Sequence, residues 1–240
     1  DYAQYSSNPS KNASSKMSPY LHYGHISTHE IFEKLINHES WSPEEIKPNL
    51  VGRREGWWGG SLNFDSFLDE LITWRELGYH TCVRRANYNQ YSSLPEWAVK
   101  TLEEHTIDDR KHIYSLDQLT FSETHDEIWN AAQNQLREEG VIQNYLRMLW
   151  GKKILEWSPN PQMALSYMMT LNDRYALDGR DPNSYSGVFW VLGRYDRAWG
   201  PEREIYGKIR YMTSDSAARK FNLKPYLEKW GNTSKEVTTL

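Results

Sequence analysis

Six charged or amide side chains lie within or directly beside apolar helical segments of this 240-residue chain. A buried ionised group without a partner costs on the order of several kcal/mol, so such groups must pair with one another or meet a polar ligand. They are Arg75 and Glu76 in WREL, Arg147 in LRMLW, and Asn172, Asp178 and Asp181 in LNDRYALDGRD.

Two tryptophans stand seven residues apart in the segment NYLRMLWGKKILEW. On a helix, Trp150 and Trp157 would project from one face about 10 Å apart, with Ile154 between them. Core packing explains most aromatic stripes of this kind, and it remains the first interpretation here.

A turn rich in hydroxyl groups precedes a helical segment in NASSKMSPYLHYG. Backbone N–H groups and the dipole at a helix N-terminus suit a phosphate or a pyrophosphate. Ordinary capping by Ser18, ahead of Pro19, explains the same residues. Both interpretations stay open on the sequence of this turn.

Several other kinds of site are not supported. His22, His25 and His29 have a spacing that could chelate a metal, but the HExxH glutamate is missing, so no metal site is predicted. Cys82 is the only cysteine, which excludes an intramolecular disulfide and fits a reducing compartment. Neither a P-loop nor a G-x-G-x-x-G motif occurs.

The composition is that of a polar chain. One quarter of the residues are charged, the mean hydropathy is -0.81 and no apolar run approaches 18 residues, so no membrane span is expected. The N-terminus shows no signal peptide. The net charge is -4, yet cations outnumber acids from Gly193 to Trp230, which is compatible with a nucleic-acid partner.

Helical periodicity dominates the elements, and no segment alternates like a strand, so an all-α fold in one domain over residues 1–240 is predicted. Residues 1–16 are expected to be irregular and 231–240 a tail. Loops are expected at 41–62 and 173–187. Helices are expected at 19–36, 64–83, 95–104, 115–119, 127–139 between a Thr124–Asp126 cap and Gly140, 141–157 and 161–171, with two or three short ones after the second loop.

Six collinear blocks between Tyr2 and Tyr226 resemble the FAD-binding C-terminal domain of the class II cyclobutane pyrimidine dimer (CPD) DNA photolyases, within the photolyase/cryptochrome family. They are KMSPYLHYGHIS, ELITWREL, THDEIWNAAQ, LRMLWGKKILEW, LNDRYALDGRDPN and AWGPEREIYGKIRYM. The resemblance implies a helical FAD-binding domain, and the family's N-terminal α/β antenna domain is not present in this chain.

By this resemblance the chain binds FAD in a bent form that works in its reduced, anionic state. Arg147 would pair with Asp178 beside the isoalloxazine, and Asn172 would face its N5 atom. Tyr2 and the turn from Ser14 to Ser18 would hold the phosphates. The full set of implied cofactor residues is Tyr2, Ser14, Ser15, Lys16, Met17, Ser18, Arg75, Asn144, Arg147, Asn172, Asp178, Arg180 and Asp181.

The resemblance also implies residues that handle a dimer flipped out of double-stranded DNA. A partly buried Glu76 would hydrogen-bond the dimer carbonyls, and it is grouped with Arg147, Asn172 and Asp178 as catalytic. Met148 and Trp190 would pack on the lesion, and His80 lies one helical turn after Glu76. Lys152, Lys153 and the basic C-terminal third would contact phosphates.

The two tryptophans acquire a second interpretation from the same resemblance. Trp150 would be nearest the flavin, Trp129 would be the middle ring, and Trp157 would be the exposed end of an electron-hopping chain that photoreduces oxidised FAD. Core packing remains an additional role for these rings.

The implied activity is that of a deoxyribodipyrimidine photo-lyase acting as a monomer, in the cytoplasm near the nucleoid, or in the nucleus of a eukaryote. The alternative is a cryptochrome-like photoreceptor that binds FAD without repair. A helical DNA-binding or scaffolding protein without flavin is a third possibility. One departure is Gln143-Asn144 before YLRM, where class II members usually carry His-Gly. The antenna chromophore is not predicted.

Overall fold

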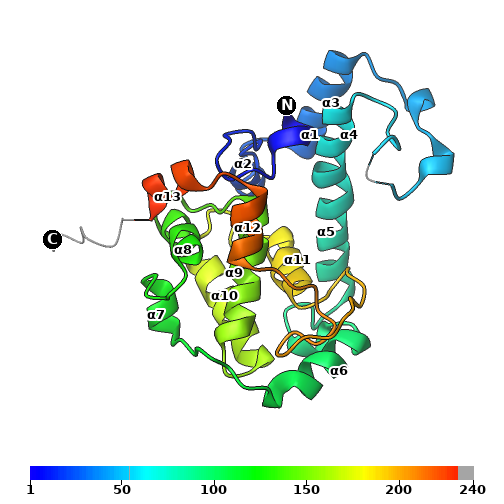
Figure 1. Cartoon of the computed structure of the whole chain (residues 1–240). Coiled ribbons are helices and arrows are strands. Elements are labelled where there is room, and N and C mark those ends of the chain that lie inside the picture. The colour runs from blue at the N-terminus through cyan, green and yellow to red at the C-terminus, as the bar shows by residue number, and fades with distance from the viewer. Residues whose placement is uncertain (54, 232–240) are drawn as a thin grey trace.

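The computed structural model describes residues 1–53 and 55–231, and in these residues it is helical with a single isolated bridge between Arg203 and Gly207. This confirms the mostly α fold predicted from periodicity (Figure 1). The α-helices are α1 (Tyr2–Tyr5), α2 (Ser18–His22), α3 (Thr28–Glu39), α4 (Leu62–Leu68), α5 (Arg75–Arg84), α6 (Glu96–Glu104), α7 (Leu116–Thr120), α8 (Glu127–Glu139), α9 (Asn144–Trp157), α10 (Pro161–Tyr175), α11 (Pro182–Val191), α12 (Ser214–Lys220) and α13 (Lys224–Trp230).

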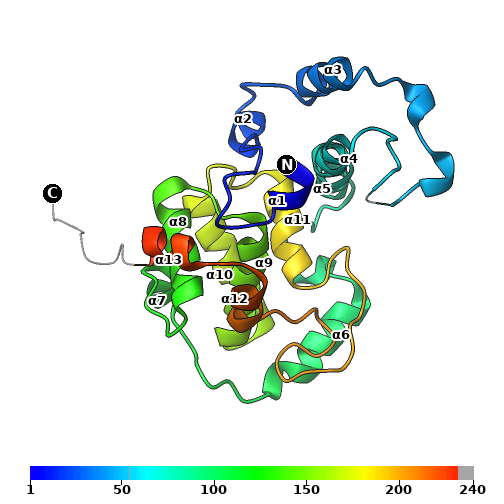
Figure 2. The same cartoon turned by 45° about the horizontal axis from the view of Figure 1, so that its top comes forward.

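Helix α9 lies at the centre of the larger hydrophobic core, with α8, α10 and α11 around it (Figures 1 and 2). Nine of its residues are buried, from Leu146 to Trp157, and they lie on most sides of the helix. The prediction that this segment is apolar on most faces and therefore buried is confirmed. Such a helix needs neighbours all around it, and the surrounding helices supply them.

A second, smaller core forms around α4, where Ile31, Phe64, Leu68 and Leu71 are buried together. Helix α3 and the segment that follows it extend away from the bundle in both cartoon views (Figures 1 and 2). The segment contains two 3₁₀ turns, η1 (Pro43–Glu45) and η2 (Pro48–Leu50), where the sequence predicted a loop.

The segment predicted as one helix over 64–83 contains a π-helical stretch, η3 (Asp69–Trp74), between α4 and α5. Its first and last residues are connected, because Trp74 Nε1 donates a hydrogen bond to Asp69 Oδ2 at 2.9 Å. π-Helical turns are rare and often occur at functional sites.

Four sequence predictions about boundaries are wrong. The helix predicted over 19–36 is two helices, because Gly24 takes a left-handed conformation (φ +71°) between them. Ser18 is the first residue of α2 and makes no capping hydrogen bond from its side chain. Residues 1–16, which were expected to be irregular, include the short helix α1. Helix α11 begins at Pro182, inside the predicted loop 173–187, and Asp181 is its N-cap.

Other boundaries agree with the signals read from the sequence. Asp126 caps α8 by accepting hydrogen bonds from two backbone N–H groups, and Gly140 ends the helix with φ +70°. Pro161 opens α10 as predicted, but the helix continues to Tyr175, four residues beyond its predicted end. None of the helices in the described ranges has the length and apolar character required to cross a membrane. The predicted tail lies outside the described residues beyond Gly231.

Helices α5 and α11 approach each other closely at Gly78. A β-carbon at this position would lie 2.8 Å from Ser186 Oγ and 3.1 Å from the carbonyl oxygen of Pro182. We expect Gly78→Ala to lower the free energy of unfolding by roughly 1–3 kcal/mol in urea denaturation, because the helices must move apart.

Gly187→Ala is the matched control, because a β-carbon at Gly187, which also lies in α11, would have no neighbouring atom within 4 Å. This substitution should leave stability unchanged or raise it by up to about 1 kcal/mol. Equal effects from the two substitutions would contradict the close contact.

Candidate active site

Arg147 and Asp178 come together as predicted, from the first half of α9 and from the turn between α10 and α11. Arg147 Nη1 lies 3.9 Å from Asp178 Oδ1, which is too long for a hydrogen bond. Asp178 Oδ1 is buried and has no hydrogen-bond partner in the part of the chain that the structure describes. The pair is therefore electrostatically coupled but incompletely satisfied, as expected for side chains that receive a polar ligand.

Asp181 links two elements that are far apart in the sequence. Its carboxylate accepts a hydrogen bond from the N–H of Asn183 at 2.9 Å, and Oδ2 lies 3.2 Å from His22 Nδ1 in α2. His22 was considered in the sequence only for a metal. Among the described residues, no three His, Cys, Asp or Glu side chains gather as a metal site.

Arg75 and Tyr79 form a second polar contact, one turn apart on α5. Arg75 Nη2 donates a hydrogen bond to the Tyr79 hydroxyl at 2.9 Å, and its guanidinium carbon lies 4.3 Å from the ring centroid. Burial, with a smaller contribution from Asp181, raises the pKa of Tyr79. Tyr79 thus stays a neutral hydroxyl at physiological pH.

Asn172 and Arg180 both contact Asp173. The buried Asn172 reaches Asp173 Oδ1 only at 3.5 Å through Nδ2, and the backbone N–H of Arg180 donates to the same oxygen at 3.1 Å. The Arg180 backbone is left-handed, with φ +65°, and the residue is exposed. Asn172 is therefore buried with weak hydrogen bonding, whereas Arg180 faces solvent.

The predicted phosphate turn is largely open to solvent: Ser14, Ser15, Lys16 and Ser18 are exposed, and Met17 is half-buried. A nearby cavity of about 430 Å³ has walls formed by Asp1, Tyr2, Tyr5, Lys11, Asn12 and Ala13, so of the predicted residues only Tyr2 lines it.

Two further cofactor residues can be placed. The Tyr2 ring packs edge-on against Phe67 of α4 at 5.2 Å. Asn144 is the exposed first residue of α9, and the preceding Gln143 both caps this helix and donates a hydrogen bond to the carbonyl oxygen of Ser6. Gln143 therefore fastens the N-terminal segment to the central helix.

The expectation of a partly buried Glu76 is wrong. Its side chain is 64% exposed, and its nearest cation is Arg75, with Nη1 3.6 Å from Oε1. Glu76 points to solvent because it lies on the face of α5 opposite the contact with α11 at Gly78. His80 is exposed as well.

Trp74 was missed by the sequence reasoning, and it packs against the predicted Trp190 with ring centroids 4.4 Å apart and planes at 42°. Trp190 also contacts Tyr195 at 6.2 Å. The only feature of the sequence that could have indicated Trp74 was the presence of an aromatic residue in the block TWREL. Met148 is half-buried against the larger core.

The three predicted relay tryptophans are close together, but Trp157 is not an exposed terminus: it is 1% exposed, Trp129 is fully buried and Trp150 is 3% exposed. Trp129 Nε1 donates to the carbonyl oxygen of Trp150 at 3.0 Å, and its ring meets that of Trp157 edge-on at 5.6 Å. Trp150 Nε1 donates to Gln133 Oε1 at 2.8 Å.

Tyr114 and His125 cover Trp157 and explain why it is buried. Their ring centroids lie 5.4 and 5.3 Å from that of Trp157, and the Tyr114 hydroxyl is 2.7 Å from His125 Nδ1. His112 stacks on His125 at 4.0 Å. Burial, followed by the charge of His112, lowers the pKa of His125.

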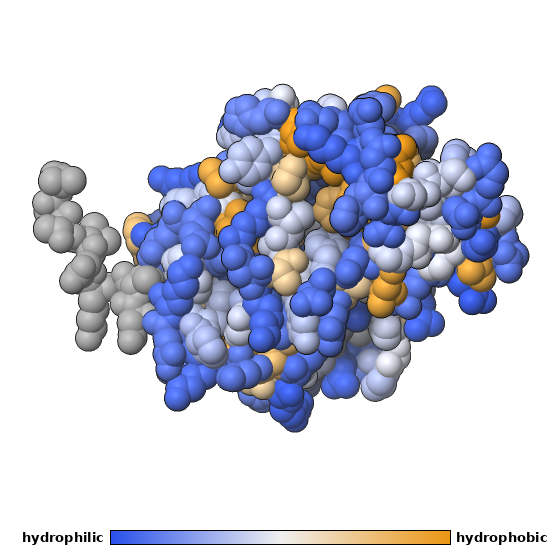
Figure 3. Space-filling view, turned by 90° about the horizontal axis from the view of Figure 1, so that it is seen from above, coloured by the Kyte–Doolittle hydropathy of each residue, from blue (hydrophilic) through white to orange (hydrophobic). Residues whose placement is uncertain are grey.

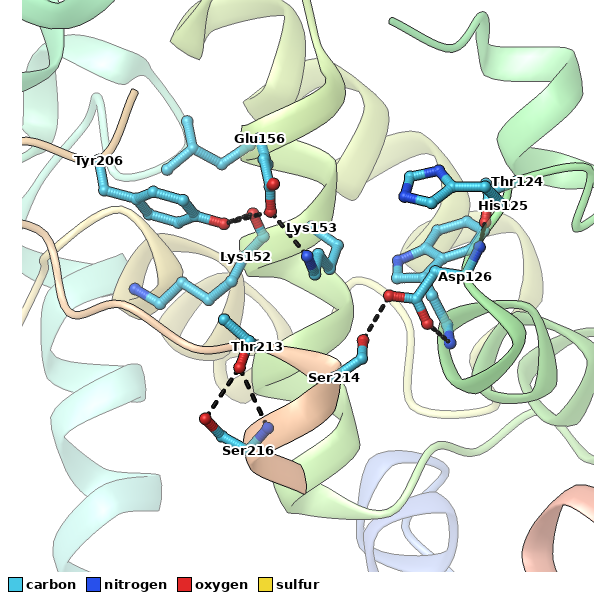
Figure 4. A network of polar contacts seen from close by, with 12 residues as sticks. Thr124, His125, Asp126, Lys152, Lys153, Glu156, Tyr206, Thr213, Ser214 and Ser216 are labelled. Atoms are coloured by element: carbon cyan, nitrogen blue, oxygen red, sulfur yellow. Dashed lines mark hydrogen bonds and ion pairs between the residues drawn. The ribbon is translucent and has the colours of Figure 1, made fainter. Parts of the chain in front are cut away.

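Lys152 and Lys153 do not reach a surface where they could contact phosphates, so that prediction is wrong. Lys152 is fully buried, donates to the carbonyl oxygen of Val191 at 2.5 Å, and has a pKa lowered to about 7 by burial. Lys153 Nζ lies 2.9 Å from Glu156 Oε2, which also accepts from the Tyr206 hydroxyl (Figure 4).

Exposed arginines in the segment 196–212 lie over aromatic rings. The guanidinium carbons of Arg197 and Arg210 are 4.7 and 5.0 Å from the centroid of Trp199, and that of Arg203 is 4.7 Å from Tyr211. The face seen in Figure 3 is mainly hydrophilic, with its apolar residues in small separate patches. The local basic character predicted from the sequence therefore includes a set of ordered, exposed cations.

No family model matches the chain. Among curated proteins, the deoxyribodipyrimidine photo-lyase of Methanothermobacter thermautotrophicus is 42% identical over 228 residues, covering 95% of this chain and 46% of that protein. The deoxyribodipyrimidine photo-lyase of Potorous tridactylus is 40% identical over 223 residues, covering 92% of this chain and 38% of that protein. The chain spans less than half the length of these relatives.

One solved structure, a bacterial class III photolyase from Agrobacterium tumefaciens, superposes with a TM-score of 0.65 over 95% of this chain and 40% of that chain. Its 18% identity supports the likeness of fold alone. The chain is thus similar in sequence to two proteins named deoxyribodipyrimidine photo-lyase and similar in fold to a bacterial photolyase.

Proposed function

We propose that this chain is the flavin-binding part of a class II photolyase, which uses light to split cyclobutane pyrimidine dimers in DNA. The observation that carries the proposal is the identity of about 40% to two proteins named deoxyribodipyrimidine photo-lyase, over more than nine tenths of the chain. Reduced FAD, when bound, would supply the photoexcited electron that opens the dimer and is afterwards returned.

The unsatisfied Arg147 and Asp178 pair fits the flavin. The Asp178 oxygen that lacks a partner is buried, and Arg147 retains donors that Asp178 does not use. Arg147 would balance the negative charge of a reduced, anionic isoalloxazine, while Asp178 would hold the guanidinium in place. Asn172, buried with only one long contact, would offer its amide to the same ring system.

The cavity beside Tyr2 fits the other end of the cofactor. Three of its lining residues, Lys11, Asn12 and Ala13, directly precede the hydroxyl-rich turn in the sequence. Lys11 supplies a positive charge to the cavity wall. Phosphates would be bound by Lys11, by Tyr2 and by groups of the turn from Ser14 to Ser18, with Lys16 in the left-handed conformation (φ +55°) that bends the chain there. The cavity beside Tyr2 is not lined by Arg147, Asn172 or Asp178. A second cavity, which lies between Arg85 and Arg194, is not lined by them either.

The paired rings of Trp74 and Trp190 would pack on the flipped dimer, because two aromatic faces can replace the stacking that the lesion loses on leaving the duplex. A carboxyl group beside this pair would hydrogen-bond the dimer carbonyls. Glu76, the candidate from the sequence, lies on the opposite face of the helix from this pair. Glu70, four residues before Trp74 on the same continuous helix, is a second.

DNA phosphates on either side of the lesion would meet the exposed arginines at Trp199 and Tyr211. Guanidinium groups resting on aromatic rings are held in place, so less conformational freedom is lost when they bind phosphate. These arginines, rather than the buried Lys152 and Lys153, would contact the phosphates.

A cryptochrome-like photoreceptor is the second candidate. The buried contact between Trp129 and Trp157 would serve photoreduction equally in a receptor and in a repair enzyme. The two functions differ at the half-buried Trp74 and Trp190 pair, which a receptor does not need.

Asp178→Asn should weaken retention of FAD by about tenfold or more, because Arg147 loses the carboxylate that positions it. The measurement is the fraction of flavin absorbance retained after dialysis. Asp215→Asn, at an exposed position in the first turn of α12, is the control and should retain flavin like the unchanged protein. Equal retention in the two variants would contradict the flavin assignment.

Trp129→Phe and Trp157→Phe should each stop or strongly slow photoreduction of oxidised FAD while the helical circular dichroism persists. Trp230→Phe, at a buried position of α13 that is 6% exposed, is the control for the loss of an indole from the core. Flavin reduction would be followed by absorbance under blue light with an external reductant. Normal rates in both relay variants would refute the relay while leaving flavin binding intact.

Glu76→Gln and Glu70→Gln separate the two carboxyl candidates. The substitution at the correct position should lower the repair of dimer-containing oligonucleotides by the reduced protein on the order of a hundredfold, because one group that stabilises developing charge is lost. The measurement is recovery of thymine absorbance under light. Repair at the normal rate in the Glu76 variant alone would assign the role to Glu70, and normal rates in both would exclude a carboxyl role.

A further inference from the structure

Arg194, in the turn after α11, is a buried cation outside the site described above. Only 5% of the residue is exposed, and its guanidinium carbon lies 3.8 Å from the centroid of Phe189. Nη2 donates to the carbonyl oxygen of Tyr88 at 2.8 Å and to the Ser93 hydroxyl. Nε is buried and has no hydrogen-bond partner among the described residues.

Neither Arg194 nor the nearby Arg85 forms an ion pair with a carboxylate in the described part of the chain. Arg85 donates to the carbonyl oxygen of Ser93 at 3.3 Å, so the two guanidinium groups bind the same residue. Burial, and then the charge of Arg85, lower the pKa of Arg194 to about 10. A buried cation next to a second cation is costly unless an anion is present.

A cavity of about 210 Å³ lies between these arginines, bounded by the end of α5, the start of α6 and the turn after α11. It is lined by Thr81, Arg85, Ser93, Pro95, Arg194 and Tyr195, and none of these is acidic. The hydroxyls of Thr81 and Tyr195 are 2.5 Å apart. Among nearby acids, Asp196 is engaged with Trp199 Nε1 and the N–H of Arg197.

We propose that this cavity binds a phosphate group, with Arg194 and Arg85 supplying both the positive charge and the N–H donors. The hydroxyl protons of Ser93, Thr81 and Tyr195 are already donated to the carbonyl oxygens of Gln90 and Leu77. The phosphate belongs either to a DNA strand or to a free phosphorylated molecule. Tyr195 contacts Trp190, so the cavity adjoins the aromatic pair assigned to the lesion, and this favours the DNA backbone. That source rests on the proposed function, whereas phosphate binding itself does not.

The first test is a titration with inorganic phosphate, followed through the side-chain Nε–H signal of Arg194 in the full chain. The signal of this Nε–H group should shift and reach a limiting value as phosphate saturates the cavity. Arg85→Gln should weaken phosphate binding by about tenfold, the size of one charge-assisted contact. Arg84→Gln removes an identical charge from the same helix turn at an exposed residue that does not line the cavity, and it should change the affinity little.

Arg85 is chosen for substitution because Arg194 holds the carbonyl oxygen of Tyr88 and its loss could unfold the segment. An Arg194 signal that does not move, or equal affinities in the two variants, would overturn the proposal. Binding that persists in Arg85→Gln with unchanged affinity would show an adventitious ion only, and would overturn it too.

The second test distinguishes the sources of phosphate with an undamaged duplex and a 5′-mononucleotide. For a DNA phosphate, Arg85→Gln should reduce the slope of log affinity against log salt concentration by about one relative to Arg84→Gln. Inorganic phosphate should also compete with the duplex for binding. For a free ligand, the mononucleotide should shift the Arg194 signal while both variants bind DNA alike. Because neither test needs flavin or light, failure here leaves the proposed repair activity untouched.

Discussion

The burial of α9 on most of its sides is the constraint on which the other features depend. A helix with apolar residues all around must be covered all around, and α8, α10 and α11 do so. The polar groups that α9 carries are then confined to a few directions. Arg147 meets Asp178, Lys152 meets the carbonyl oxygen of Val191, and Lys153 meets Glu156.

These three contacts differ in how completely they satisfy the buried charge. Lys152 has a strong acceptor and a pKa near 7, so it can be accommodated as a neutral amine. Lys153 has a carboxylate at hydrogen-bonding distance. Arg147 has only a carboxylate oxygen at 3.9 Å, and a guanidinium cannot lose its proton at this pH. The incomplete contact therefore distinguishes Arg147, which we propose contacts the flavin, from the two lysines, whose contacts are internal to the fold.

Local signals in the sequence predicted the larger part of the fold. Asp126, Gly140 and Pro161 act through their own backbone and near neighbours, and each marks the boundary it was expected to mark. Gly24 was overlooked because the apolar spacing continues across it, although the chain turns there. The pairing of Arg147 with Asp178 was implied by family resemblance, since 30 residues of helix and turn separate them and no local pattern connects them.

The exposure of individual side chains could not be predicted, because it depends on residues distant in the sequence. Trp157 is buried by Tyr114 and His125, which precede α8. Trp74 meets Trp190 only because Gly78 lets α5 approach α11. Lys152 and Lys153 looked like surface cations, yet the coverage of α9 places both in the interior.

The three tryptophans that we propose as a relay also differ in their electrostatic surroundings. The indole N–H groups of Trp129 and Trp150 donate to oxygen atoms, whose partial negative charge would stabilise a positive charge on either ring. Trp157 instead has the Lys153 ammonium 5.4 Å from its ring centroid, which opposes a positive charge there. Glu156, 2.9 Å from Lys153, offsets much of that opposition. A positive charge on Trp157 would therefore be neither strongly disfavoured nor strongly stabilised. The Tyr114 hydroxyl and His125 Nδ1, which adjoin this ring, lie 2.7 Å apart and can share a proton in a hydrogen bond.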